Sequence, residues 1–119
     1  MIRTENSIIV AMGGLGGYNT ALVFNIDGKF VRSVGSMGQG PGEYNMILNA
    51  AFDDRNSRLY ILANRPYKIV CYHLDGKFVK ESLLDQNGWY YDINYNNDEL
   101  LLECLYSGEI IHTKKQCIA

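Results

Sequence analysis

Asp27-Gly28-Lys29-Phe30-Val31 is repeated 48 residues later as Asp75-Gly76-Lys77-Phe78-Val79. Each copy follows a run rich in apolar and aromatic residues. An Asp-Gly pair between two such runs is typical of a β-hairpin, and we expect a two-residue type I′ turn with both residues at positive φ. An internal period of this length predicts a protein built from stacked copies of one supersecondary unit.

The second copy lies in a complete repeat of four predicted strands. These strands cover residues 49–53, 58–63, 68–74 and 77–82 and are separated by turn formers, among them Asn64-Arg65-Pro66-Tyr67. No helical period of 3.6 competes with this pattern, because the apolar clusters are short and interrupted by Gly, Asn and Asp. The sequence therefore predicts an all-β protein made of antiparallel four-stranded meanders.

The same template fits the residues on either side. Before the complete repeat it predicts strands at 7–12, 21–26 and 30–34, with a first strand missing or frayed into residues 1–5; after it, strands at 90–95, 99–106 and 110–113. Repeats of this length are typical of β-propeller blades, and a propeller closes with about four to eight of them. We expect one partial β-propeller domain over residues 1–119, with an incomplete blade at 1–36, a complete blade at 48–84 and an incomplete blade at 90–115.

Composition excludes several classes of function. The chain has 119 residues, is 47% hydrophobic and carries a net charge of −2, with no basic stripe to collect phosphates, so we do not expect nucleic acid as a partner. No run approaches the roughly 20 apolar residues of a membrane span. Residues 1–12 are too short and too polar for an export signal, so the sequence leaves the compartment unknown.

Reactive side chains form no recognisable site in the sequence. Cys71, Cys104 and Cys117 are odd in number and contain no CxxC pair, which argues against a disulfide framework. We expect the first two to be buried in strands and the third to be an exposed thiol. His73 and His112 have no second ligand at metal spacing, so we assign no metal.

The remaining candidates also have ordinary structural explanations. The glycine-rich residues 13–20 lack the Lys-Ser/Thr of a phosphate loop, so we assign no cofactor. Asp53-Asp54 and Asp98-Glu99 pair carboxylates at turns, where solvated acids are common, and Ser107 has no partner base in view. We name no catalytic residue, and a non-catalytic protein is favoured over an enzyme.

The propeller template sorts the loops onto two faces. One face receives the longer loops at 12–20, 35–44, 64–67 and 85–90, and the other receives only short turns. Binding residues gather on long loops of rigid scaffolds. The predicted ligand-binding rim therefore consists of Gln39, Glu43, Tyr44, Arg65, Tyr67, Trp89 and Tyr90. Two alternatives stay open: Glu43 and Tyr44 fix the glycine-rich loop, and Trp89 with its neighbouring tyrosines packs between blades.

Residues 31–44, which follow Asp27-Gly28-Lys29-Phe30 and contain Gly38-Gln39-Gly40-Pro41-Gly42-Glu43-Tyr44, resemble a bacterial six-bladed β-propeller family related to NHL repeats. That family repeats the pattern DGKF…GxxGxGPGEY between blades. In the second copy only residues 75–78 match, and residues 85–90 replace the glycine-rich loop. The resemblance covers residues 7–113. It implies a periplasmic or cell-surface protein of unassigned function, with a full chain near three times this length.

These observations favour a non-catalytic binding or scaffold module that presents its loop-rich face to a carbohydrate, peptide or protein partner. A propeller-type hydrolase or lyase whose site needs missing blades is the first alternative, since fold does not decide function. A non-functional remnant of a longer gene is the second. Open sheet edges invite pairing with another chain, so we also expect self-association through the strands at both ends.

Overall fold

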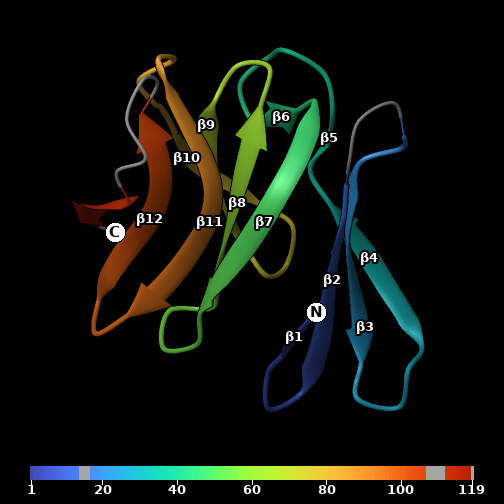
Figure 1. Cartoon of the computed structure of the whole chain (residues 1–119). Coiled ribbons are helices and arrows are strands. Elements are labelled where there is room, and N and C mark those ends of the chain that lie inside the picture. Colours follow the sequence, from blue (N-terminus) through green and yellow to red (C-terminus); the bar gives the residue numbers. More distant parts are fainter. Residues whose placement is uncertain (14–16, 107–111, 119) are drawn as a thin grey trace.

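The computed structural model describes residues 1–13, 17–106 and 112–118, with side chains up to residue 104 (Figure 1). All regular structure in these residues is β, which confirms the all-β prediction. No helix in these ranges could span a membrane. Three antiparallel sheets follow one another along the chain, in the orders β1-β2-β3-β4, β7-β8-β9-β10 and β11-β12-β13, and they do not close into a ring.

The strand bounds follow the repeat closely. The first sheet contains β1 (Ile2–Arg3), β2 (Ser7–Met12), β3 (Thr20–Asn25) and β4 (Phe30–Val34). The middle sheet contains β7 (Met46–Asp53), β8 (Arg58–Asn64), β9 (Lys68–His73) and β10 (Phe78–Leu83). The third sheet contains β11 (Gly88–Asn96), β12 (Glu99–Tyr106) and β13 (His112–Ile118). The first strand of the first repeat, expected to be missing or frayed, is present as β1.

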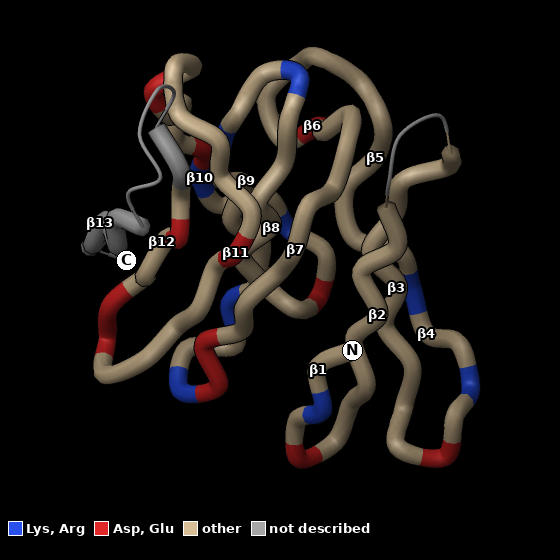
Figure 2. The backbone as a smooth tube through the Cα atoms, in the orientation of Figure 1, with Lys and Arg blue, Asp and Glu red and all other residues tan. Residues whose placement is uncertain are grey.

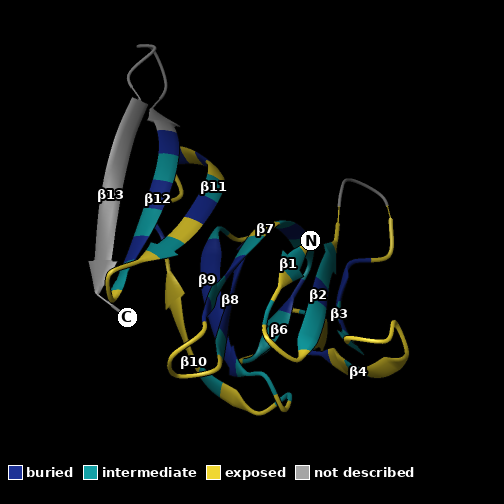
Figure 3. Ribbon diagram, turned by 90° about the horizontal axis from the view of Figure 1, so that it is seen from below, coloured by how far each residue is buried: buried dark blue, intermediate teal, exposed yellow. Residues whose placement is uncertain are grey.

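The central strands β8 and β9 of the middle sheet are buried on both faces, because the sheet lies between the other two, whereas its outermost strand β10 is mostly exposed (Figure 3). In β8, Leu59 and Ile61 belong to the core shared with the first sheet, whereas Tyr60 and Leu62 belong to the core shared with the third. Successive side chains of a strand point to opposite faces, so this strand reads as a continuous apolar run. The same reason explains why Cys71 in β9 is buried.

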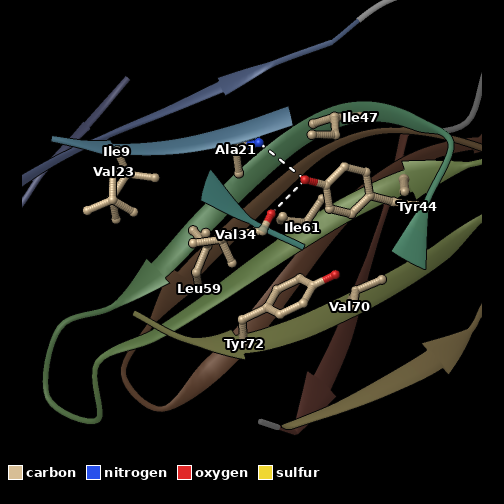
Figure 4. Close-up of a cluster of buried hydrophobic side chains, with 11 residues drawn as sticks. Ile9, Ala21, Val23, Val34, Tyr44, Ile47, Leu59, Ile61, Val70 and Tyr72 are labelled. Carbon is tan, nitrogen blue, oxygen red and sulfur yellow. Dashed lines mark hydrogen bonds between the residues drawn. The ribbon is translucent and has the colours of Figure 1, made fainter. Parts of the chain in front are cut away.

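Two clusters of buried side chains hold the sheets together. The cluster between the first and middle sheets is drawn in Figure 4 and contains Ile9, Ala21, Val23, Val34, Tyr44, Ile47, Leu59, Ile61, Ala63, Val70 and Tyr72. The cluster between the middle and third sheets contains Ala51, Tyr60, Leu62, Ile69, Cys71, Leu84, Tyr90, Ile93, Leu100, Leu102 and Cys104. Neighbouring sheets therefore stack face to face, as blades of a propeller do.

The two Asp-Gly hairpins differ from the expected type I′ turns. The N–H of Gly28 donates to the carbonyl of Asn25 at 2.9 Å, and the N–H of Asn25 donates to that of Lys29 at 2.8 Å. Gly28 has φ of 87°, but Asp27 is not at positive φ. The loop thus has three residues, with the glycine forming a bulge, and the residues around Gly76 repeat it. The two-residue turn with both φ positive occurs instead at Asn97 and Asp98.

The connection between the first and middle sheets contains structure that was expected to be loop. β5 (Ser36–Met37) and β6 (Glu43–Tyr44) form a short parallel pair across the glycine-rich segment. The N–H of Gly40 donates to the Glu43 carboxylate at 2.9 Å, which holds the loop closed. A Cβ at Gly38 would lie 2.5 Å from that carboxylate, so a side chain here would displace Glu43 from the loop.

Candidate functional site

Two neighbouring turns form the wall of a hollow, on the face that carries the short connections. The turn between β7 and β8 supplies one side, and the turn between β11 and β12 supplies the other. This hollow, which we call the turn hollow, has a volume of about 380 Å³ and is lined by Phe52, Asp53, Asp54, Arg55, Tyr95, Asn96, Asn97 and Asp98. Its size lies within the range of small-molecule sites.

Asp53 organises the first of these turns. It is only 2% exposed, and its carboxylate accepts hydrogen bonds from the backbone N–H of Asn56 at 3.2 Å and from the Asn56 side chain at 2.8 Å. Burial by itself would raise the pKa of Asp53, but the hydrogen bonds from Asn56, together with those from Tyr95 and the Arg55 backbone, lower it below its ordinary value. Asp53 is therefore ionised at neutral pH.

Tyr95 forms the wall beside this carboxylate. Its ring stacks on Tyr60, with 5.8 Å between ring centroids and 8° between the planes. Its hydroxyl donates to Asp98 at 3.4 Å. Burial, the hydrogen bond to Asp53 and the negative charges of Asp53 and Asp98 raise the pKa of Tyr95 to about 12. The hydroxyl therefore keeps its proton at neutral pH and uses it on these carboxylates, so its oxygen remains as an acceptor for a ligand.

Charges of both signs surround the turn hollow (Figure 2). Arg55 and Asp98 approach across it, with 3.7 Å between the guanidinium and the carboxylate, and both side chains are mostly exposed. An exposed ion pair of this kind contributes little stability. Both groups can therefore turn to a ligand at small cost. With Asp53, Asp54 and Asp98 against Arg55, the lining carries more negative than positive charge.

A second hollow continues along the innermost strands of the three sheets. This strand hollow has a volume of about 270 Å³ and is lined by Ile2, Arg3, Ala50, Ala51, Phe52, Asp54, Ile93, Asn94 and Tyr95. It shares Phe52, Asp54 and Tyr95 with the turn hollow, so the two form one continuous concave surface. Above it the side chain of Asn49 in β7 donates to Asp92 in β11 at 2.6 Å, which ties the two innermost strands together.

The seven predicted rim residues do not share one exposed surface. Tyr44 is 0% exposed and Tyr90 is 2% exposed, and each lies in the core between two sheets. Tyr67 is half-buried and packs edge to face on Tyr90, with 5.1 Å between ring centroids. These three side chains fill space between sheets, which for Tyr90 was the packing alternative stated for the tyrosines beside Trp89.

The other four rim residues lie nearer the surface. Gln39, Arg65 and Trp89 are exposed, and Trp89 is 66% exposed. Glu43 is half-buried and bonded to its own loop, as the structural alternative stated. The Arg65 carbonyl accepts a hydrogen bond from Asn45 at 2.7 Å, which fixes this turn to the connection from the first sheet. The binding role of Gln39, Arg65 and Trp89 stays a prediction.

The sequence analysis missed the turn hollow because it treated its acids as separate solvated turns. The usable signal was the arrangement of Asp53 and Asn56 in one repeat and of Asn97 and Asp98 in the next, at equivalent turns of adjacent repeats. His112 and Cys117 lie beyond the described side chains, and Ser107 and residues 14–16 lie outside the described ranges. In the part of the chain that is described, no group of His, Cys, Asp and Glu could hold a metal ion.

Comparison with known proteins gives a family and a fold. The family model described as "Domain of unknown function (DUF4934)" matches residues 1–116. No curated protein sequence is similar enough to count as a relative. A solved protein of Bacteroides fragilis, whose name gives export as an inference, shares 23% identity over 85% of this chain and 28% of its own, with a TM-score of 0.73.

The β-propeller domain of Cps50 (Swd1) from Myceliophteria thermophila matches 98% of this chain and 40% of its own length, with 12% identity and a TM-score of 0.54. At such identities the likeness concerns the fold alone. This chain is an incomplete β-propeller, since its sheets match a propeller domain but do not close. It spans 28% and 40% of the two solved chains it resembles.

Proposed function

Because this chain belongs to the DUF4934 family, whose description assigns no activity, we propose a function from the geometry: a non-catalytic binding module that holds a saccharide unit in the turn hollow. The observation that carries this proposal is the pairing of aromatic walls with fixed polar groups in one small concavity. Phe52 and Tyr95 supply apolar surface, while the surrounding carboxylates, amides and guanidinium supply acceptors and donors for hydroxyl groups.

The chemistry of Asp53 supports binding over catalysis. A general acid needs a pKa near the working pH, usually raised by burial. The pKa of Asp53 is instead lowered, and its carboxylate is already occupied by Asn56 and Tyr95. It serves as a fixed acceptor that orients the neighbouring Tyr95 hydroxyl. The excess of carboxylates in the lining selects against anionic ligands.

The test is chemical-shift mapping on isotope-labelled protein with a panel of neutral mono- and disaccharides. We expect shifts in residues 52–55 and 95–98 for at least one sugar, and loss of binding in Tyr95→Ala. Tyr91→Ala is the matched control, because Tyr91 lies on the same strand, is 40% exposed and does not line the hollow. Shifts confined to the surroundings of Arg65 and Trp89 would transfer the site to the predicted rim. No binding by any sugar, or binding unchanged in Tyr95→Ala, would reject the proposal.

The finer classification is also a proposal. We propose that residues 1–36, 48–84 and 90–115 are blades related to NHL repeats and belong to a six-bladed arrangement. The repeated Asp-Gly-Lys-Phe hairpins support it, as do the equivalent positions of Tyr44 and Tyr90, each of which precedes a buried isoleucine by three residues. We also propose that this chain belongs to an exported protein, and the printed name of the Bacteroides fragilis protein supports this.

A further inference from the structure

The first sheet has an apolar face that points away from the rest of the molecule. In β2, Ile8 and Val10 alternate with Ile9, which packs toward the middle sheet, so they point to the opposite side. Leu22 and Phe24 in β3 lie on that same side, because they are the cross-strand partners of Val10 and Ile8. No sheet covers this outer face in the ranges the structure describes (Figures 1 and 3).

The outer face repeats, position by position, a face that is buried elsewhere in the chain. Ile8 pairs with Phe24 as Leu59 pairs with Tyr72. Val10 likewise pairs with Leu22 as Ile61 pairs with Val70. In the middle sheet these equivalent residues are at most 1% exposed, because the first sheet covers them.

The equivalence extends to the outermost strands. Phe24 packs edge to face on Phe30, with 5.9 Å between ring centroids, and Tyr72 packs in the same way on Phe78 at 6.1 Å. Phe30 in the first sheet is 59% exposed, against 40% for Phe78 in the middle sheet, and Met12 at the end of β2 is 49% exposed. The outer face therefore has the composition of a sheet-to-sheet interface and lacks the covering sheet within the described part of the chain.

The contacts between the described sheets show which kind of sheet face covers a face like the outer face of the first sheet. The first and middle sheets each use one face to cover the following sheet, through Ile9 and Val23 in the first and through Tyr60 and Leu62 in the middle one. The corresponding face of the third sheet carries Leu101 between Glu99 and Glu103, opposite in direction to Leu100 and Leu102, which pack inward. Asn94 and Asn96 in β11 are the cross-strand partners of Leu101 and Glu99, so this face is more polar than its two counterparts. Among the described sheets, each copy thus has one face of each kind without a neighbouring sheet.

The charges on these two faces are complementary. Arg3 in β1 is the cross-strand partner of Ile8, so it lies on the outer face of the first sheet. Glu99 and Glu103 lie on the outer face of the third sheet, to either side of Leu101. Opposite charges at the border of an apolar contact favour one register and one partner over others.

We propose that two copies of this chain associate head to tail, with the first sheet of each packed on the third sheet of the other. Two copies of these 119 residues supply six blade-like sheets, not counting the two-stranded pair of β5 and β6. Six falls within the range at which propellers close, whereas three copies would exceed it. A heterologous contact that closes in this way gives a defined dimer and no filament. The contact uses sheet faces and does not depend on a ligand, so its failure would leave the saccharide proposal untouched.

The test is the molar mass of the 119-residue chain by sedimentation velocity and light scattering. We expect a dimer for the wild type, and monomers for Leu22→Asp and Leu101→Asp, because each places a charge in one of the two faces. Leu83→Asp is the matched control, since Leu83 is 70% exposed on β10, outside both faces, and this variant should stay dimeric. Met12→Asp, at a more exposed position of the outer face, repeats the test if Leu22→Asp does not fold by circular dichroism.

Mixing the two variants expected to be monomeric gives a second experiment, in which association is the expected result. Each keeps the face that the other has lost, so Leu22→Asp and Leu101→Asp should form a heterodimer through their one intact contact. A wild-type monomer at the highest attainable concentration would overturn the proposal. A dimer that persists in both Leu22→Asp and Met12→Asp would also overturn it. A dimer that is lost in Leu22→Asp but kept in Leu101→Asp would overturn it too, because it would mean a symmetric contact between the two first sheets. Disruption by Leu83→Asp would point instead to pairing of edge strands.

Discussion

The hydroxyl of Tyr44 donates a hydrogen bond to the carbonyl of Val34 at 2.6 Å (Figure 4). The same oxygen accepts a hydrogen bond from the N–H of Ala21 at 3.3 Å. Ala21 and Val34 are cross-strand partners in β3 and β4, so the tyrosine completes the end of their ladder. Because Tyr44 comes from the connection to the middle sheet, this single hydroxyl fixes that connection to the first sheet.

Replacing Tyr44 by phenylalanine should lower the free energy of unfolding by about 1–3 kcal/mol, because it leaves a buried donor and a buried acceptor without their partner. Urea denaturation followed by circular dichroism measures the change. Tyr18→Phe is the control, since Tyr18 is 79% exposed, and it should unfold like the wild type. Equal stability of Tyr44→Phe and Tyr18→Phe would contradict this account of the connection.

The fold could be predicted because its signals are local. Short apolar runs bounded by turn formers, aligned on the repeated Asp-Gly pairs, located β2, β4 and β12 at their observed bounds. The turn type was wrong, because the φ of Asp27 depends on whether the loop closes after two residues or three, which the dipeptide does not decide. The parallel pair of β5 and β6 was missed because it joins two-residue segments held by Glu43.

The site was harder to predict because burial is a long-range property. Tyr44 and Tyr90 follow loops and looked exposed in the sequence, yet each is covered by a neighbouring sheet. Sequence spacing also does not show that the turns at Asp53 and Asp98, more than 40 residues apart, lie beside each other. That proximity exists only once the middle and third sheets stack.

Substituting two glycines at positive φ distinguishes the cost of backbone strain from the cost of steric overlap. Gly28 has φ of 87°, and a side chain there would meet nothing within 4 Å. Gly35 has φ of 72°, and a Cβ there would lie 2.5 Å from both the Tyr44 ring and the Tyr72 hydroxyl. We expect Gly28→Ala to cost about 1 kcal/mol and Gly35→Ala about 3 kcal/mol or more in unfolding free energy. Similar costs for the two variants in urea denaturation would show that the rings move aside freely.

The pair formed by Lys68 and Glu81 predicts unequal effects of removing either partner. Lys68 has its side chain 5% exposed, with its ammonium 3.4 Å from the carboxylate of Glu81, which also accepts a hydrogen bond from Gly42 at 2.8 Å. Glu81→Ala should cost about 3 kcal/mol, because it leaves a buried ammonium alone. Lys68→Met should cost about 1 kcal/mol or less, since Glu81 is partly exposed and keeps Gly42.

The double variant Lys68→Met with Glu81→Ala supplies the internal control for this pair. It should be more stable than Glu81→Ala by itself, because the unpaired charge is gone. Urea denaturation of the four proteins gives the coupling free energy. A double variant less stable than both single variants would mean that the two side chains act on stability separately.

Asp53 predicts how stability depends on pH in acid. Its folded pKa is lowered, so its contribution to stability is present above its unfolded value of about 3.9 and is lost as the pH falls through the folded pKa. The free energy of unfolding should therefore decrease as the pH falls below about 4.

Asn56→Ala removes the strongest donor to the Asp53 carboxylate, so the titration midpoint of Asp53, followed by carbon NMR of its carboxyl group, should rise toward the ordinary value. Asn87→Ala, whose side chain lies away from the turn hollow, should leave that midpoint in place. If Asn56→Ala does not move the titration midpoint of Asp53, another group holds the carboxylate ionised. A higher midpoint in Tyr95→Phe would then identify the Tyr95 hydroxyl as that group.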